Sequence, residues 1–474
     1  MTSDTDLCFL SALEHKRLLQ SREVSAVELL DAQLAQIEQS NPSVNAIVTL
    51  TADRARNEAA ASDARRANGE PMGVLDGLTV GVKDLFLTRG VRTTFGSPIY
   101  ADLVPDSNHL IVEREQIAGA VMMGKTNTPE FGAGAQTFNA VFGVTRNPYD
   151  LSRTCGGSSG GSAVALACGM TSLANGSDFG GSLRAPAAWC NIAGFRPSPG
   201  RVPSVPSKLP WNTLSVHGPM ARTVADLALY LNAIAGPDPR APLSVEQPAS
   251  VFAESLARDF SATRVAWSPD LGYLPVDPEI ASICAAAMPV LEQLGCVVEQ
   301  TAPDFRGASE IFKTLRAAKF AVDRYEELQA HRERIKRTII GNTEAGLRQS
   351  GLEVSQAEAA RATLWHQVRE FMHTHEFMVT PVNPVPPFGA EQETLTEIGG
   401  VKMSTYVDWG ALRHVVSLLG LPSLSVPCGF TADGLPVGLQ ITGRHHADFA
   451  VLQLGHAFEQ AAPYWRRRPS CIGY

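Results

Sequence analysis

One lysine and two short glycine–serine segments carry the residue types of nucleophilic catalysis. Lys83 ends the apolar run 78–82, residues 156–162 read GGSSGGS, and residues 178–184 read DFGGSLR. Glycine-rich turns can direct several backbone amides at one developing anion. A lysine at the end of an apolar strand is partly desolvated, which favours the neutral amine and lets it accept a proton. Serine paired with lysine is a variant of the Ser-His-Asp triad, although each segment alone also fits an ordinary turn or a solvated strand end.

Two other motif matches are contradicted by their context. Residues 119–126, GAVMMGKT, fit the P-loop expression, but an apolar strand lies inside the motif, where an open phosphate-binding loop is required. Residues 156–160 fit the nucleophile elbow G-x-S-x-G, yet the preceding NPYDLSRTC is not the apolar strand that such an elbow follows. The sequence therefore argues against a P-loop nucleotide site and against a Ser-His-Asp hydrolase.

The elements that position these segments alternate between strands and helices. Ser25 and Glu28 form a capping box for a helix over 25–38, which we expect to stop at Asn41-Pro42. Hydrophobic periodicity predicts strands at 45–50, 78–83, 119–124, 264–267, 296–299, 423–428 and 437–442. It predicts helices at 52–67, 109–118 and 278–294, another that begins at Thr223, and mostly helix over 308–375. This alternation is typical of the α/β class.

The composition is that of a folded, acidic protein. The 474 residues carry 40 Lys plus Arg against 48 Asp plus Glu, a formal net charge of −8, and 44% of them are hydrophobic. An acidic chain without a cluster of basic residues argues against nucleic acid as a partner. No apolar run approaches the ~18 residues that span a bilayer, and the first thirty residues lack the apolar stretch of a signal peptide. We therefore expect no membrane association and a cytoplasmic location.

Neither a metal site nor a disulfide framework is expected. The eight cysteines, which include Cys471, form no C-x-x-C pair, and the eleven histidines form no H-E-x-x-H motif. Sparse cysteines in such a chain are typically buried and reduced. We predict free thiols, no metal and no cofactor.

The three catalytic-type segments, in this order, resemble the amidase signature family. Flanking stretches resemble it too, among them LDGLTVGVKDLF, MMGKTNTPEFG, GSDFGGSLRAPAAWCNIAGFRPSPGRVP and GLPSLSVPCGFTADGLPVGLQITG. The resemblance covers essentially the whole chain and is weakest over about 300–375. It implies one large α/β domain over 1–474, with a central mixed, twisted sheet covered by helices on both faces. Residues 78–205 would form the catalytic core, and 238–375 a peripheral helical segment that shapes the substrate pocket.

The resemblance also implies a site, carried over position by position. Ser182 matches the nucleophile, Ser158 the bridging serine that follows a cis Gly-Ser peptide bond, and Lys83 the base. The oxyanion hole would be formed by the amides of Phe179, Gly180, Gly181 and Ser182, and the loop would be braced by Asp178 and Arg184. The implied reaction is hydrolysis of a small-molecule carboxylic amide to acid and amine through acyl-Ser182, by a free-standing enzyme for which we expect a homodimer.

The substrate is predicted from aromatic residues in the segments that line the family's acyl pocket. The predicted pocket residues are Phe131, Gly132, Trp189, Trp211, Tyr406 and Trp409. They favour an aryl or apolar substrate over a dicarboxylate. Carbamates and esters offer a similar carbonyl, so urethanase or esterase activity is an alternative. A second alternative is the A subunit of the glutamine-dependent tRNA amidotransferase, which usually has Thr, Gln and Tyr-Gly-Arg where this chain has Phe179, Ala185 and 199–201.

Overall fold

The computed structural model describes residues 4–469, and they build one domain around a sheet of eleven strands. The sheet order is β1-β3-β2-β8-β10-β9-β16-β17-β13-β11-β12. Its strands are β1 (Ile47–Leu50), β2 (Thr79–Lys83), β3 (Val121–Thr126), β8 (Leu173–Asp178), β9 (Ala193–Arg196), β10 (Val216–Ala221), β11 (Arg264–Trp267), β12 (Val297–Gln300), β13 (Phe377–Pro381), β16 (Ser423–Phe430) and β17 (Pro436–Gly443). β2 pairs in parallel with β3 and β8, and β11 with β12 and β13, whereas the other pairs are antiparallel. The predicted mixed α/β fold is confirmed.

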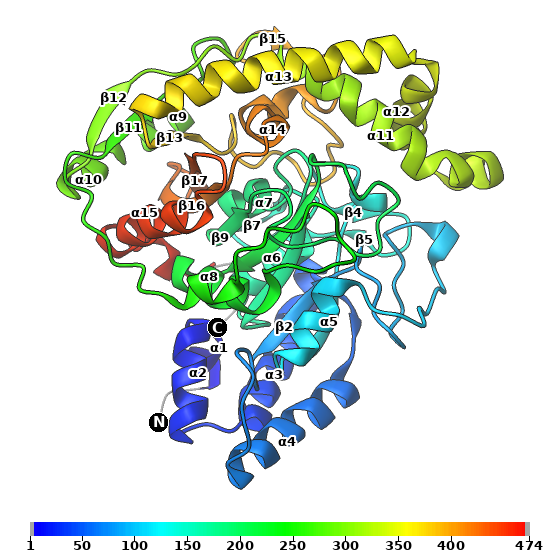
Figure 1. The fold of residues 1–474 in the computed structure, drawn as a ribbon. Coiled ribbons are helices and arrows are strands. Elements are labelled where there is room, and N and C mark those ends of the chain that lie inside the picture. Colours follow the sequence, from blue (N-terminus) through cyan, green and yellow to red (C-terminus); the bar gives the residue numbers. More distant parts are fainter. Residues whose placement is uncertain (1–3, 470–474) are drawn as a thin grey trace.

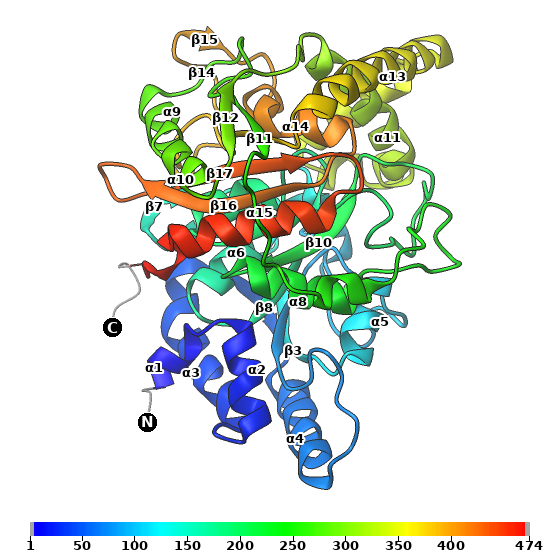
Figure 2. The same ribbon diagram turned by 60° about the vertical axis from the view of Figure 1, so that its left-hand side comes forward.

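Three two-stranded ribbons and fifteen α-helices surround this sheet in the described chain. The ribbons are β4 (Phe138–Asn139) with β5 (Gly143–Val144), β6 (Arg146–Asn147) with β7 (Asp150–Thr154), and β14 (Glu397–Ile398) with β15 (Val401–Lys402). The helices are α1 (Asp4–Cys8), α2 (Ala12–Ser21), α3 (Ala26–Val44), α4 (Ala52–Asn68), α5 (Leu110–Ile117), α6 (Gly160–Ala167), α7 (Arg184–Trp189), α8 (Val224–Ile234), α9 (Pro278–Ala285), α10 (Met288–Gln293), α11 (Ala308–His331), α12 (Arg337–Arg348), α13 (Gly351–Thr374), α14 (Ala411–Leu418) and α15 (Asp448–Ala461). In Figures 1 and 2, α11 and α13 lie at the opposite end of the molecule from α2, α3 and α4.

Helices cover both faces of the central sheet at close range. A Cβ added to Gly455 of α15 would lie 2.1 Å from Leu424 Cδ2, and one added to Gly438 of β17 would lie 2.5 Å from Ala188 Cβ of α7. The latter Cβ would also be 3.0 Å from Ser425 Oγ. Because Leu424 and Ser425 are successive strand residues, they face opposite sides, and α15 and α7 therefore cover opposite faces. The glycines allow this close approach.

Two predicted helix boundaries are wrong, and proline chemistry explains both. α3 continues through Pro42 to Val44, where Asn45 closes it with φ 53°. A proline in the last turn removes only one hydrogen bond, and the Asn41 side chain accepts from the amides of Ala46 and Ile47 just beyond the helix. Conversely, the helix predicted over 278–294 is divided into α9 and α10, with Pro289 in the first turn of α10. A proline without an N–H favours a new helix start at that point.

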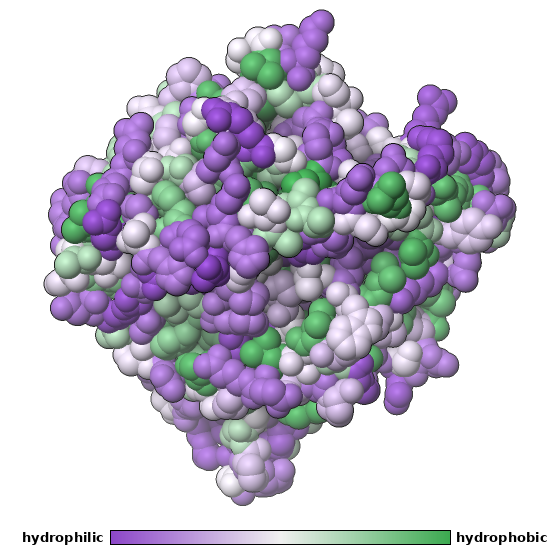
Figure 3. All heavy atoms as spheres, turned by 45° about the horizontal axis from the view of Figure 1, so that its top comes forward, coloured by the Kyte–Doolittle hydropathy of each residue, from purple (hydrophilic) through white to green (hydrophobic). Residues whose placement is uncertain are grey.

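The remaining expectations about cysteines and surface concern only the described residues. Seven cysteines in this part of the chain are buried, five of them as free thiols, and Cys471 lies outside it; the five are Cys155, Cys190, Cys284, Cys296 and Cys428. Within residues 4–469 no helix is long and apolar enough to cross a membrane. The face in Figure 3 is mostly hydrophilic, with hydrophobic residues scattered over it.

Candidate active site

Lys83 ends β2 inside a shell of serine hydroxyls. Its side chain is fully buried, and Nζ lies 2.7 Å from Ser158 Oγ, 2.8 Å from Ser159 Oγ and 3.0 Å from Ser177 Oγ. Burial lowers the pKa of the Lys83 amine well below its usual value, and the opposing charge of Asp178 is the smaller effect. A neutral amine has two N–H donors and one lone pair, so three hydroxyl neighbours can satisfy it completely.

Ser158 and Ser159 lie in the turn between β7 and α6. The Gly157–Ser158 peptide bond is cis, as the family resemblance implies. A Cβ on Gly157 would come within 2.9 Å of the carbonyl carbon of Gln136, so only glycine fits there. The amide of Ser159 donates to the Ser182 carbonyl oxygen at 3.2 Å. The structure therefore joins the two glycine–serine segments directly.

The loop of residues 179–183, which holds Ser182, is attached to the carboxylate of Asp178 at the end of β8. Asp178 accepts from the amides of Gly181 at 2.9 Å and Leu183 at 3.1 Å. Its two oxygens also accept from Arg184, from Nη2 at 3.0 Å and from Nε at 3.1 Å. One carboxylate thus fixes both halves of the loop and the start of α7.

A second arginine, Arg196 of β9, completes this buried cluster. Its Nη1 donates to the carboxylate of Asp178 at 2.9 Å, and all three side chains are fully buried. Burial alone would raise the pKa of Asp178, but Arg184 and Arg196 hold that pKa below its usual range. Asp178 therefore stays ionised at neutral pH. Sequence reasoning missed Arg196 because it lies on a separate strand with no local motif.

The loop amides are not all available to a ligand. The Gly181 N–H, which the resemblance assigns to the oxyanion hole, donates to Asp178 in this structure. The amides of Phe179, Gly180 and Ser182 have no partner in the described chain. Gly181 is instead required for packing: its φ is 114°, and an added Cβ would lie 2.5 Å from Arg413 Cδ.

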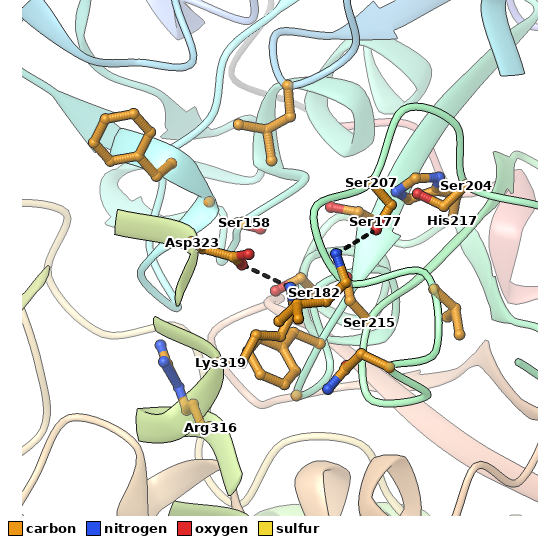
Figure 4. A pocket seen from close by; sticks show the side chains of 18 of the residues that line it. Ser158, Ser177, Ser182, Ser204, Ser207, Ser215, His217, Arg316, Lys319 and Asp323 are labelled. Carbon is orange, nitrogen blue, oxygen red and sulfur yellow. Dashed lines mark hydrogen bonds and ion pairs between the residues drawn. The ribbon is translucent and has the colours of Figure 1, made fainter. Parts of the chain in front are cut away.

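A cavity of about 710 Å³ opens beside this loop. Its lining includes Ser158, Ser177 and Ser182 on one side and residues of α11 on the other, as Figure 4 shows. The predicted pocket residues Phe131, Gly132, Tyr406 and Trp409 line it, whereas Trp189 and Trp211 do not.

The two tryptophans fail as pocket residues for opposite reasons. Trp189 is 1% exposed and stacks on Trp409 with ring centroids 5.6 Å apart, so it supports the wall from behind. Trp211 is 71% exposed and is not among the residues that line the cavity, although its neighbours Pro210 and Asn212 are. Residue type alone does not distinguish a tryptophan that lines the cavity from one packed behind the lining or one exposed on the surface.

The helix α11 lies in the segment 238–375 that we expect to shape the pocket, and it supplies a wall of the cavity whose residues the sequence did not single out. Phe312, Arg316, Lys319, Phe320, Asp323, Arg324 and Glu327 line it. These positions recur every three or four residues and therefore form one stripe along the helix. That spacing was the available signal, but it is also the signal of an ordinary packed helix face.

Comparisons with known proteins agree with this geometry. The family model described as Amidase matches residues 28–452. An acylamidase of Rhodococcus erythropolis is 35% identical over 472 residues, which cover 99% of this chain and 98% of the relative. The A subunit of the glutamyl-tRNA(Gln) amidotransferase of Moorella thermoacetica is 35% identical over 489 residues, covering 98% of this chain and 99% of the relative.

Solved structures give the same result. A bacterial aryl acylamidase of the amidase signature family superposes with a TM-score of 0.92 at 29% identity, over 98% of this chain and 99% of that one. The amidotransferase A subunit of Thermotoga maritima superposes with a TM-score of 0.73 at 27% identity, over 96% of each chain. The chain therefore belongs to the amidase signature family and is an amidase that acts on amide C–N bonds.

Proposed function

We propose that this amidase works through a Ser182–Ser158–Lys83 triad and an acyl-Ser182 intermediate. The observation that carries the proposal is the contact of 2.7 Å between the buried Lys83 amine and Ser158 Oγ, beside the loop that holds Ser182. An amide is a poor electrophile, so it needs both an activated nucleophile and charge stabilisation at its carbonyl oxygen.

In acylation, Ser182 Oγ attacks the carbonyl carbon. Its proton passes to Ser158 Oγ, and the proton of Ser158 passes to the neutral amine of Lys83. The negatively charged oxygen accepts hydrogen bonds from the loop amides of Phe179, Gly180 and Ser182, each worth about 3 kcal/mol. The shell of hydroxyls around Lys83 supports this role because it contains no carboxylate that would hold the amine protonated.

Collapse of the tetrahedral adduct breaks the C–N bond. The proton on Lys83 returns through Ser158 to the leaving nitrogen, the amine departs, and Ser182 carries the acyl group as an ester. Water then adds to this ester with the same relay and releases the acid. One water is consumed for each acid and amine formed, and every step uses groups of this chain, so we propose a reaction that needs no metal or cofactor.

We further propose an aryl or apolar substrate. Phe131, Phe179, Phe312 and Phe320 supply much of the cavity lining, and the 710 Å³ volume suits a small molecule. The names of the acylamidase and aryl acylamidase relatives support the same class. Carbamates and esters stay as alternative substrates, because the site recognises a carbonyl rather than the atom beside it.

The amidotransferase subunit is the rival function, because relatives of that name are equally identical in sequence. The TM-score of 0.92 to the aryl acylamidase against 0.73 to the amidotransferase subunit favours the free-standing enzyme. Phe179, one of the predicted oxyanion donors, also departs from the Thr usual in that subunit. Co-purification with a second subunit, together with glutamine as the preferred amide, would contradict the proposal.

Active-site labelling tests the nucleophile. A serine-directed sulfonyl fluoride should modify one peptide, containing residues 178–184, and Ser182→Ala should abolish both labelling and hydrolysis of aryl, aliphatic and carbamate substrates. Ser158→Ala should cost less than Ser182→Ala, since water can replace a relay but not a nucleophile. Labelling elsewhere, with hydrolysis intact, would refute the assignment.

Three properties of the whole protein stay predictions. Exhaustive chelation should leave the rate unchanged, and a loss restored by zinc would contradict metal independence. Light scattering should give the mass of a homodimer, twice 50.7 kDa. Fractionation of producing cells should recover the enzyme in the cytoplasm.

A further inference from the structure

Arg316, in the middle of the cavity wall formed by α11, is a buried cation without a counter-ion. Its side chain is 7% exposed and lines the cavity. Nη2 donates to the Tyr406 hydroxyl, and Nη1 is buried with no hydrogen-bond partner in the described chain. No ion pair involves this guanidinium within residues 4–469.

Other cations on the same stripe are paired within α11. Lys319 lies 2.6 Å from Asp323, four residues on, and Arg324 lies 2.9 Å from Glu327, three residues on. Figure 4 shows the Lys319–Asp323 pair and Arg316 around the same cavity. Three and four residues after Arg316 the sequence has Lys319 and Phe320, so the helix offers Arg316 no acid.

Aromatic rings surround the Arg316 guanidinium but do not satisfy its N–H donors. The guanidinium carbon lies 4.1 Å from the ring centroid of Phe320, and 5.4 Å from those of Phe179 and Tyr406. Rings stabilise a cation through their faces, but the N–H groups of a guanidinium lie in its plane and match the paired oxygens of a carboxylate. A buried charge without such a partner is costly.

The charge of the cavity also favours an anion. Its lining contains five cationic side chains, Lys208, Arg316, Lys319, Arg324 and Arg413, against two acidic ones, Asp323 and Glu327. Lys208 pairs with Glu326 outside the lining, Lys319 with Asp323 and Arg324 with Glu327, which leaves Arg316 and Arg413 as the surplus among the described residues. The chain as a whole carries −8, so this surplus is local to the cavity. A cleft lined by one sign of charge concentrates ligands of the other sign.

We propose that Arg316 binds a carboxylate of the substrate, so that the natural substrate is an amide with an aryl or apolar body and one carboxylate. The proposal rests on the proposed function and narrows it. Phe179 belongs to the oxyanion loop, and its ring centroid lies 5.4 Å from the Arg316 guanidinium carbon, so a carboxylate at Arg316 and a carbonyl at the loop would share one cavity. The carboxylate can belong to the acyl part or to the amine part.

Binding without turnover tests the site independently of the reaction. In Ser182→Ala enzyme, calorimetry with 4-phenylbutyrate and its neutral analogue 4-phenylbutyramide should show a preference for the carboxylate. Adding Arg316→Gln should weaken 4-phenylbutyrate binding at least tenfold and change the amide less than threefold. Arg324→Gln is the matched control. Arg324 is a paired cation of the same helix, and like Arg316 it lies over an aromatic ring, that of Phe131 at 4.3 Å. Its removal should lower the preference for the carboxylate less than threefold.

Hydrolysis by otherwise wild-type enzyme then tells which side carries the carboxylate. Glutaryl 4-nitroanilide against butyryl 4-nitroanilide tests the acyl side, and 4-butyramidobenzoate against butyranilide tests the amine side. Arg316→Gln should lower kcat/KM selectively, by tenfold or more, for the charged member of one pair. Arg316→Lys should keep part of that preference, since it retains the positive charge but loses the paired N–H donors of the guanidinium.

The two assays separate the possible failures. Equal losses for charged and neutral ligands in folded Arg316→Gln and Arg316→Lys enzymes would overturn the carboxylate site and leave Arg316 as a support for its aromatic neighbours. Selective carboxylate binding by an enzyme that hydrolyses no amide would overturn the proposed function instead.

Discussion

Two lysines on neighbouring parallel strands differ in what surrounds them. Lys83 on β2 and Lys125 on β3 are both fully buried, and the strand register pairs Lys83 with Thr126 and Val82 with Lys125. The two side chains therefore leave opposite faces of the sheet. Lys83 contacts three serine hydroxyls in the active site, whereas Lys125, on the other face, lies near a carboxylate.

The surroundings of Lys125 favour the protonated, positively charged amine. Its Nζ donates to the Phe86 carbonyl and to the hydroxyls of Thr88 at 3.0 Å and Thr93 at 3.1 Å, and it lies 4.0 Å from Asp84. Burial lowers the pKa of Lys125 to about 8, with Asp84 opposing that shift. The amine therefore stays mostly protonated at neutral pH.

The comparison shows that burial alone does not make a lysine a base. Both lysines are equally buried, but only Lys83 lacks a carboxylate at contact distance, and the carboxylate of Asp178 is already occupied by two arginines. What distinguishes the proposed base is therefore the type of its partners.

The largest expected effect follows from removing Lys83. Lys83→Met should lower kcat about 10⁴-fold, because the relay then has no final proton acceptor. Hydrolysis of an anilide, followed on protein with a native circular dichroism spectrum, measures it. A folded variant within tenfold of the wild-type rate would disprove the triad.

Removing Lys125 should affect stability instead. Lys125→Met leaves Asp84 buried without its cation, which costs about 3–5 kcal/mol in the free energy of unfolding. Urea denaturation measures this loss, and the remaining folded enzyme should keep its rate within about tenfold. If the variant instead lost activity as completely as Lys83→Met, the two lysines would not have separate roles.

A third change would make the Lys83 environment resemble that of Lys125. Ser177 Oγ lies 3.0 Å from Lys83 Nζ. Ser177→Asp therefore places a carboxylate next to this amine and favours its ammonium form. Because the neutral amine is the active form, kcat/KM rises with pH as Lys83 loses its proton. The variant's acid limb should therefore move to higher pH, with a loss of about tenfold to a hundredfold at pH 7.

The control for this change is Ser177→Asn, which has the same shape without the charge. Its pH profile of kcat/KM should keep the wild-type acid limb. An unshifted limb in Ser177→Asp would mean that Lys83 is not the group that titrates.

The smallest effect is expected from Ser159, one of the three hydroxyls around Lys83. Ser159→Ala removes one hydrogen bond to the Lys83 amine, worth about 1 kcal/mol, together with two longer contacts to the Ser177 backbone, and leaves the Ser158 and Ser177 hydroxyls in place. We expect kcat to fall about fivefold to tenfold, with KM unchanged. A loss as large as that of Ser158→Ala would show that the two serines share the relay.

The sequence predicts the parts of the site that lie in contiguous segments. Ser158, Ser182 and Asp178 stand in short glycine-rich stretches, and Lys83 ends an apolar strand, so local pattern is enough to find them. Ser159 and Ser177 lie in the same stretches, but a pattern cannot say which hydroxyls face the amine. That depends on how β2 and β8 align, which only the folded sheet determines.

Residues that act across elements are beyond the reach of local pattern. Arg196 reaches Asp178 from another strand, and Arg316 reaches the cavity from a helix more than a hundred residues further along the chain. Trp189 and Trp211 differ from the prediction for the same reason, because residue type predicts neither burial behind the cavity wall nor exposure to solvent. Mixed α/β architecture, by contrast, follows from strand and helix periodicity alone.

The stripe along α11 lies next to the reaction centre, so the helix that selects the substrate also touches the loop that stabilises the oxyanion. Phe312, Arg316 and Phe320 all pack on Phe179 of that loop, whereas the proton relay and the Asp178 cluster are held by β2 and β8. Point mutations on α11 can therefore reshape the accepted molecule, and those that touch Phe179 also act on turnover. For enzyme engineering, a small combinatorial library on this single helix gives access to new substrates, provided that each variant is screened for kcat as well as for KM.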